Sequence, residues 1–173
     1  VLVTLISNQI ISYEWLVIGL VLGILVGASA ASFVKMTSMP ELVALFNGFG
    51  GIASLLVGSA EYLGTGSLGL ISLTAIFLTL IIGGITFSGS LVAYGKLSEI
   101  LPGKQITFKG QRIVLVAIFI AALLFGAQLI FNFQMVEGWN PLFSFLLLIS
   151  FALVIGLLIT LPIGGADMPV IIA

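Results

Sequence analysis

Long apolar stretches, separated by short breaks, are the feature that most constrains the fold of this chain. A helix needs roughly 20 mostly apolar residues to cross the hydrocarbon core of a bilayer. Gly, Pro and Asn mark the breaks between stretches of about that length. The sequence therefore predicts an all-α protein, a polytopic bundle of transmembrane helices. Full spans are expected at residues 15–34, 40–57, 68–94, 113–131 and 141–161.

The scarcity of charge excludes several other classes of protein. Of 173 residues, five are Lys or Arg and six are Asp or Glu, while 61% are hydrophobic. A soluble domain carries about 25% charged residues, far more than this chain could place on its surface. Five basic residues and a net charge of −1 provide no electrostatic site for nucleic acid. The chain has no Cys and no His, which removes disulfides, thiol nucleophiles and the usual zinc sites, so no metal site is expected.

Two shorter apolar segments, residues 1–11 and 166–173, flank these spans. Each is expected to be part of a further span, so that the chain is a segment of a longer protein. No polar linker separates two halves, and residues 1–173 are predicted to form a single membrane domain.

The basic residues predict the orientation of the spans. If successive spans alternate in direction, every basic residue falls on one face of the membrane, and the loops of the other face hold acidic and aromatic residues. By the positive-inside rule the basic face is cytoplasmic, or faces the matrix in a mitochondrion. The basic residues are Lys35, Lys96, Lys104, Lys109 and Arg112, and the loops of the opposite face hold Glu14, Glu61 and Glu137.

Small and hydroxyl-bearing residues recur at helical spacing along several spans, so that one face of each helix carries few large side chains. Small residues let helices pack closely in lipid. Hydroxyls and amides can also line a hydrated path. The residues leave both interpretations open for the second and third spans, whereas Gly19, Gly23 and Gly27 of the first span indicate packing. The third span carries Ser72, Ala75, Thr79, Gly83, Thr86 and Ser90, and the second carries Asn47, Gly51, Ser54 and Gly58.

The acidic residues lie near the ends of the spans, so the middle of the membrane contains no obvious carboxylate. Ser38–Glu41 fits a capping box with Pro in the first helical turn, which gives Glu41 a structural explanation. Asp167, followed by Met168 and Pro169, also fits the cap of a helix. Capping and a functional role both remain open for Asp167.

Two further patterns bear on function. Gly48–Ala53 matches the GxGxxA form of a dinucleotide fingerprint, but it lies inside an apolar span and not after a strand, so we reject it as a nucleotide site. Residues 38–44 resemble residues 167–173, which suggests a parallel duplication. A repeat of this kind also occurs in secondary transporters, which are one alternative class for this chain.

Three blocks of the sequence, in order, resemble the membrane domain of the β subunit of proton-translocating nicotinamide nucleotide transhydrogenase. They are Met39–Gly48, Thr86–Leu97 and Gly164–Val170. The resemblance implies part of an enzyme that passes hydride between NAD(H) and NADP(H) while protons cross the membrane. It also implies that both nucleotides bind in soluble domains outside this chain, which itself holds no catalytic or cofactor-binding residue.

The polar faces of the second and third spans now become candidates for the proton path, which is expected along Asn47, Ser72, Thr79, Thr86 and Ser90. The resemblance itself implies that the acid at Asp167 takes part in coupling. Asp167 and Glu41 are expected to couple the membrane domain to the NADP(H)-binding domain, with Asp167 and the loop 95–112 facing that domain. Many members of the family carry a relay His, in some at the position of Ser72. Its absence here leaves the relay outside this chain, or formed by water and hydroxyls.

The resemblance also implies partners and a location. The expected partners are the lipid bilayer, membrane helices of an α subunit or a fused segment, the NADP(H)-binding domain and a second protomer in a dimer. The expected location is the bacterial inner membrane, or the mitochondrial inner membrane in a eukaryote. Two alternatives remain, a fragment of a secondary transporter and a purely structural anchor subunit.

Overall fold

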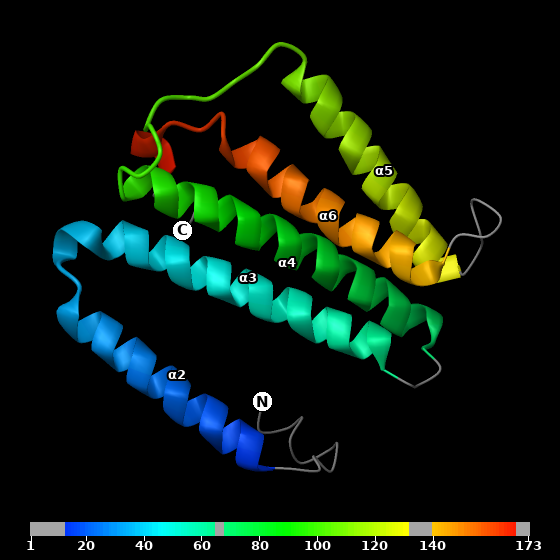
Figure 1. Cartoon of the computed structure of the whole chain (residues 1–173), viewed down its shortest axis with the longest axis horizontal. Coiled ribbons are helices and arrows are strands. Elements are labelled where there is room, and N and C mark those ends of the chain that lie inside the picture. The colour runs from blue at the N-terminus through cyan, green and yellow to red at the C-terminus, as the bar shows by residue number, and fades with distance from the viewer. Residues whose placement is uncertain (1–12, 65–67, 132–139, 169–173) are drawn as a thin grey trace. The chain divides into compact units, whose positions relative to one another are not determined.

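The computed structural model describes residues 13–64, 68–131 and 140–168 (Figure 1). Every regular element within these residues is a helix, which confirms the all-α prediction. By length and composition, five of the described helices are able to cross a membrane. They are α2 (Tyr13–Phe33), α3 (Met39–Leu63), α4 (Leu70–Leu97), α5 (Gln111–Phe131) and α6 (Pro141–Thr160); the short 3₁₀ helices are η1 (Met36–Ser38) and η2 (Gly165–Asp167).

The helices differ from the expected spans mainly at their ends. Helix α3 continues past residue 57 to Leu63, and α4 continues past residue 94 to Leu97. No Pro interrupts either extension, so the helical hydrogen bonding continues. The expected partial span at residues 1–11 lies outside the described residues, and so does most of the one at 166–173. One consequence is that Lys96 lies inside a helix and not in a loop.

The chain divides into two compact units, Val1–Met39 and Pro40–Ala173. The first contains α2, which we describe only by itself. Its Ser29 and Ser32 hydroxyls donate to carbonyls of the preceding helical turn, at Leu25 and Ala28. The packing face expected from the glycines of α2 stays a prediction.

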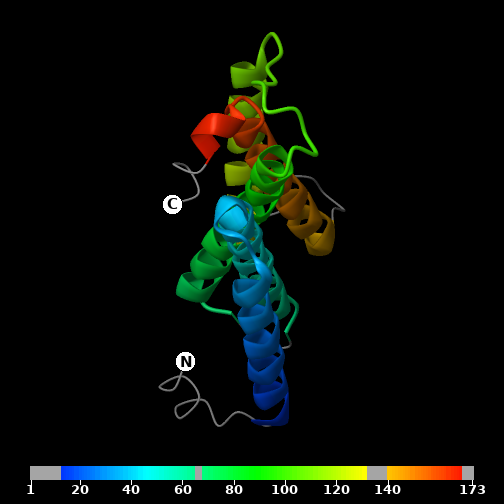
Figure 2. The same ribbon diagram turned by 90° about the vertical axis from the view of Figure 1, so that its left-hand side faces the viewer.

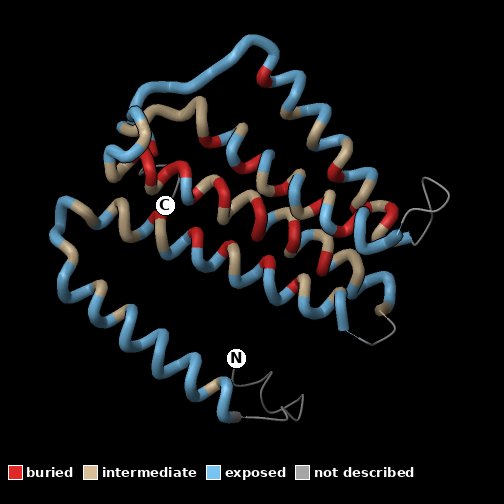
Figure 3. Tube along the Cα trace, viewed as in Figure 1, coloured by how far each residue is buried: buried red, intermediate tan, exposed pale blue. Residues whose placement is uncertain are grey.

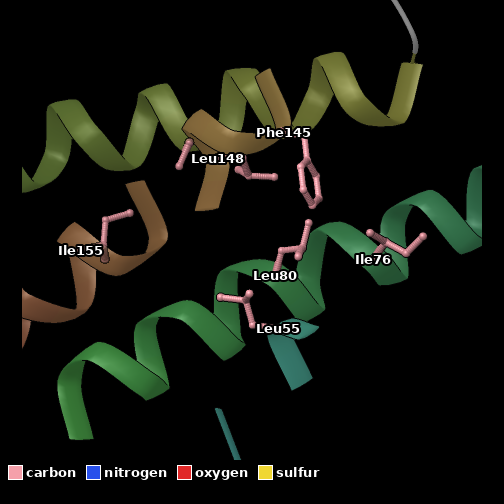
Figure 4. Close-up of a cluster of buried hydrophobic side chains, with 7 residues drawn as sticks. Leu55, Ile76, Leu80, Phe145, Leu148 and Ile155 are labelled. Atoms are coloured by element: carbon pink, nitrogen blue, oxygen red, sulfur yellow. The ribbon is translucent and has the colours of Figure 1, made fainter. Parts of the chain in front are cut away.

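Within the second unit, α4 lies between α3 and α6, and α5 packs mainly against α6, with a smaller contact to α4 (Figure 1). Buried residues are concentrated along α4 and α6 (Figure 3). Leu80 of α4 and Leu148 of α6 are fully buried, and Leu55 joins them from α3 (Figure 4). The ring of Phe145 stacks on Tyr62 with ring centroids 4.6 Å apart. One apolar core therefore connects these helices.

Glycines set how closely α4 approaches α3. A Cβ atom added to Gly51 would lie 2.6 Å from the backbone nitrogen of Phe87 and 2.9 Å from the carbonyl oxygen of Gly83. A Cβ atom added to Gly83 would lie 2.8 Å from the carbonyl oxygen of Gly51. Only two glycines allow the helix backbones to come this close. Gly51 belongs to the GxGxxA sequence, which therefore lies within α3 and serves helix packing.

A similar contact joins α4 to α6. A Cβ atom on Gly84 would lie 2.7 Å from the Cβ of Ala152, and one on Gly156 would overlap the Ser88 hydroxyl. Residue numbers rise together along this contact, from Gly84 with Ala152 to Gly89 with Thr160, so α4 and α6 run parallel. Along the α3–α4 contact, residue numbers rise on one helix as they fall on the other, so these two helices run antiparallel. The ends of α4 and α6 and the start of α3 therefore share one end of the unit.

The two adjacent glycines of α3 provide a matched test of this packing. Gly51→Ala should lower the melting temperature of the purified protein, because its new methyl group meets helix backbone that cannot move aside; overpacking costs about 1–3 kcal/mol. Gly50→Ala should cause no loss, since no heavy atom lies within 4 Å of its added Cβ. Equal melting temperatures for the two variants, measured by thermal unfolding in detergent, would contradict the close approach.

Candidate functional site

An open groove of about 500 Å³ runs between α3 and α4. It exists because small residues face each other there, leaving space that larger side chains would fill. Polar side chains line it from both helices, Asn47 and Ser54 from α3 and Thr79 and Thr86 from α4. The remaining lining is apolar or glycine: Phe46, Gly50, Gly51, Leu78, Ile82 and Gly83.

A smaller cavity of about 200 Å³ adjoins the groove toward the shared end of α3, α4 and α6. Asn47 and Thr86 line both spaces, so the groove and the cavity share part of their wall. Ser90 of α4 and Thr160 of α6 add two more hydroxyls. The apolar part of the cavity wall is Ile85, Gly89, Ala93, Ile159 and Met168.

The hydrogen bonds of these polar groups show what they can offer to water. The Asn47 amide nitrogen Nδ2 donates to Ser90 Oγ at 3.0 Å, which joins α3 to α4. Thr79 and Thr160 donate to carbonyls one turn earlier in their own helices, at Ala75 and Gly156. Among the described residues, no hydrogen bond is recorded for the Thr86 hydroxyl. It can therefore both donate to and accept from a water molecule at the junction of the two spaces.

Four of the five residues predicted for the path thus come together: Asn47, Thr79, Thr86 and Ser90. Ser72 does not join them, because it is exposed in the first turn of α4 and lines neither space. Ser72 shares a helical face with Thr79, but the residues of α3 that line the groove reach only as far as Ser54. The polar face of α4 that carries Ser72 therefore continues beyond the end of the groove.

The lining of the groove and the cavity, as far as the structure describes it, contains no ionisable side chain. The described residues likewise hold no group of three His, Cys, Asp or Glu side chains that could bind a metal. The arrangement can hold ordered water between hydroxyls and an amide, which is how polar groups in a cavity satisfy their hydrogen bonds.

Lys96 binds the end of α6. Its ammonium group donates to the carbonyl oxygens of Leu161 and Ile163, each at 2.6 Å, and only 4% of the residue is exposed. The Gln111 side chain donates to the carbonyl of Leu158 at 2.8 Å. The last carbonyls of a helix have no partner within it, and a cation there also interacts favourably with the helix dipole. Lys96 and Gln111 together therefore cap α6 from two other helices.

The loop after α4 is held by the same segment. The backbone nitrogen of Ile106 donates to the carbonyl of Leu161 at 3.1 Å, and that of Gly165 donates to the carbonyl of Gly103 at 2.9 Å. The loop and η2 consequently lie at one end of the unit (Figure 2). Loop 95–112 and the segment that carries Asp167 are thus joined directly.

Asp167 and Glu41 differ in exposure. Asp167 is exposed in η2, where its backbone nitrogen donates to the carbonyl of Gly164. Glu41 is half-buried in the first turn of α3. No hydrogen bond of the Ser38 or Glu41 side chain is recorded within the described residues, so the expected capping box is not formed, and η1 precedes the helix. The helix that Asp167 was expected to cap falls outside the described residues.

Sequence reasoning missed the role of Lys96, which it assigned to a loop as an indicator of orientation. A signal was present in the spacing. Lys96 lies seven residues after Gly89 and three after Ala93, on the face of α4 that turns toward the end of α6. A cation on a buried helical face needs partners, and the end of a neighbouring helix supplies them.

Comparisons with known proteins agree with the resemblance. The family described as NAD(P) transhydrogenase beta subunit matches residues 1–173. Two curated proteins described as NAD(P) transhydrogenase subunit beta, one from Rhodospirillum rubrum and one from a strain of that species, are each 38% identical to this chain over 181 aligned residues. The alignments cover 100% of this chain but 38% of each relative. The chain thus spans well under half the length of these relatives.

Lys96 provides a test of the helix cap. Lys96→Met should destabilise the protein by about 1–3 kcal/mol, because carbonyls at the end of α6 lose their donor in a buried site. Lys104→Met removes the same charge from an exposed position of the adjoining loop and should change stability by less than about 0.5 kcal/mol. Thermal unfolding in detergent measures both. Equal stability of the two variants would show that the contacts of Lys96 contribute nothing.

Proposed function

Because this chain belongs to the family of NAD(P) transhydrogenase beta subunits, we propose that it forms a membrane segment of a proton-translocating transhydrogenase. In this proposal the whole enzyme transfers hydride between NAD(H) and NADP(H), and this segment couples the transfer to proton passage. The observation that carries the proposal is the continuous lining of Asn47, Thr79, Thr86 and Ser90, which leads from the middle of α4 toward the end that holds Asp167.

Hydride chemistry is assigned to other parts of the enzyme. The residues described here include no cluster of catalytic side chains, and the GxGxxA sequence lies inside α3, where its buried glycines Gly48 and Gly51 pack against α4. The relatives are more than twice as long as the aligned region, which leaves room in them for nucleotide-binding domains. NAD(H) and NADP(H) are therefore proposed as cofactors of the whole enzyme, bound outside this chain.

Proton passage would rest on water held by hydroxyls and one amide. A hydroxyl both donates and accepts a hydrogen bond, so a row of hydroxyls can order water molecules into a chain. Thr86 has the central place in such a chain, since it lines both the groove and the cavity and its hydroxyl has no recorded partner among the described residues. Proton release to the basic face would follow the cavity past Ser90.

Coupling to the nucleotide domain is proposed for Asp167, with Glu41 as a second acidic group. Asp167 is exposed, and the segment before it is fixed by Lys96 and by loop 95–112. An exposed charge on a well-held segment is suited to meet a partner domain without losing its position. Glu41 lies in the first turn of α3, the helix that supplies Asn47.

The proposal also names partners and a location. A helix of an α subunit, or of a fused segment, would cover the open groove between α3 and α4, because lipid cannot satisfy its polar groups. Dimers of protomers and the bacterial inner membrane, or its mitochondrial counterpart, complete the proposal. The comparisons do not support the alternative of a secondary transporter.

The path role is tested at Thr86. Thr86→Val keeps the shape of the side chain and removes the hydroxyl, so the whole enzyme should assemble but translocate protons about fivefold more slowly, the loss that corresponds to about 1 kcal/mol of hydrogen bonding. Thr74→Val is the control, since Thr74 lies on the same helix but lines neither space. Proton pumping and coupled transhydrogenation in vesicles measure both. Normal pumping in Thr86→Val would favour the structural-anchor alternative.

The coupling role is tested at Asp167. Asp167→Asn keeps an oxygen that can cap a helix, so a capping role predicts a loss of at most about 1 kcal/mol of stability. A charge that couples two sites is typically worth about 1–3 kcal/mol, or about 5- to 150-fold in the coupled binding equilibrium. We expect normal assembly with strongly reduced coupled hydride transfer. Wild-type rates in Asp167→Asn, with loss only in Asp167→Ala, would identify Asp167 as a cap alone.

A further inference from the structure

The cavity next to the groove ends at a methionine. Met168 is fully buried, with 0% exposure, and its side chain forms part of the cavity wall together with Asn47, Thr86 and Ser90. A thioether chain has no strong hydrogen-bonding group, so water at this point has no good partner. Met168 is therefore an apolar barrier at the end of a polar lining.

Small residues make room for this side chain. Met168 packs in a cluster with Ala44 of α3 and Ala93 of α4, both buried. Larger residues at these two positions would occupy the space that the methionine fills. Met is unbranched and flexible, so it can fill such a space and can also leave it without a large rearrangement of its neighbours.

Met168 is coupled to Asp167 through a tight turn. The backbone nitrogen of Met168 donates to the carbonyl of Gly165, and that of Asp167 donates to the carbonyl of Gly164. These two successive hydrogen bonds hold Asp167 and Met168 in one turn of 3₁₀ helix. Asp167 of this turn is exposed at the basic end, and the next residue, Met168, lines the cavity.

The segment before this turn is fixed, and so is the first residue of the turn. Lys96 binds the carbonyls of Leu161 and Ile163, and the backbone nitrogen of Gly165 donates to the carbonyl of Gly103. A force applied at Asp167 therefore acts about the fixed first residue of the turn, Gly165. Displacement of the turn would draw Met168 out from between Ala44 and Ala93.

We propose that Met168 is the gate of the proton path, positioned by Lys96 and moved through Asp167. The inference rests on the proposed function, because a gate needs a path. With Met168 in place, the cavity is closed to the basic face by an apolar side chain. When the turn shifts, water enters between Ala44 and Ala93 and connects the Ser90 hydroxyl to the basic face. Met168 is a positioning residue, and no bond is made or broken at it.

The test is the proton leak of the complete enzyme in proteoliposomes, measured with a trapped pH-sensitive dye under an imposed pH gradient. Met168→Ala should raise the passive leak several-fold and lower the number of protons moved per hydride, while hydride transfer itself continues. Met168→Leu keeps the side-chain volume and should leak as little as wild type. Met36→Ala is the matched control, since Met36 is 86% exposed and does not line the cavity.

A second variant covers the case in which Met168→Ala fails to assemble. The chain has no Cys, so Met168→Cys introduces one reactive group into this segment, with any Cys elsewhere in the enzyme replaced first. Its smaller side chain should raise the leak, and alkylation with N-ethylmaleimide should refill the space and lower the leak again. A wild-type leak in Met168→Ala or in Met168→Cys would overturn the gate. A wild-type enzyme that pumps no protons would instead overturn the proposed function.

Discussion

The close approach of α4 to two other helices is the constraint on which the rest of this structure depends. Lipid supplies no hydrophobic force between helices, so they hold together by packing and by the few polar contacts that they can make. Gly51 and Gly83 bring α3 against α4, and Gly84 and Gly156 bring α6 against it. These contacts position the residues of α3, α4 and α6 that line the groove and the cavity.

The glycine contacts also explain why a groove exists beside them. A helix face built from small residues packs closely where it meets another such face and leaves an open space where it does not. Thr79 and Thr86 lie on the same side of α4 as Gly83, which forms the contact itself. Packing and path were alternatives for these residues at the level of the sequence. In the structure one stripe does the packing and also lines the space.

Polar contacts dominate the end of the unit where Lys96 lies. There the end of α6, the loop after α4 and the segment before Asp167 are connected through backbone carbonyls, two of which accept from Lys96. Carbonyls at a helix end must find partners when they are buried, and a single cation can serve two of them. The result is a fixed frame around one exposed carboxylate, next to a fully buried methionine.

The sequence by itself determined the helical class, the approximate helices and most of the residues that share a polar face, because apolar length and helical spacing are local properties. The family blocks pointed to the same class of protein. Only the tertiary structure decided that Ser72 lies beyond the groove, that Lys96 is buried in a helix cap, and that Met168 is buried in the wall of the cavity. These facts depend on which segments meet in space. At the end of the unit where Lys96 lies, residues as far apart in the sequence as 44 and 168 come together. Spacing along a single helix does not contain that information, since a contact over such a separation is set by the packing of all the helices between.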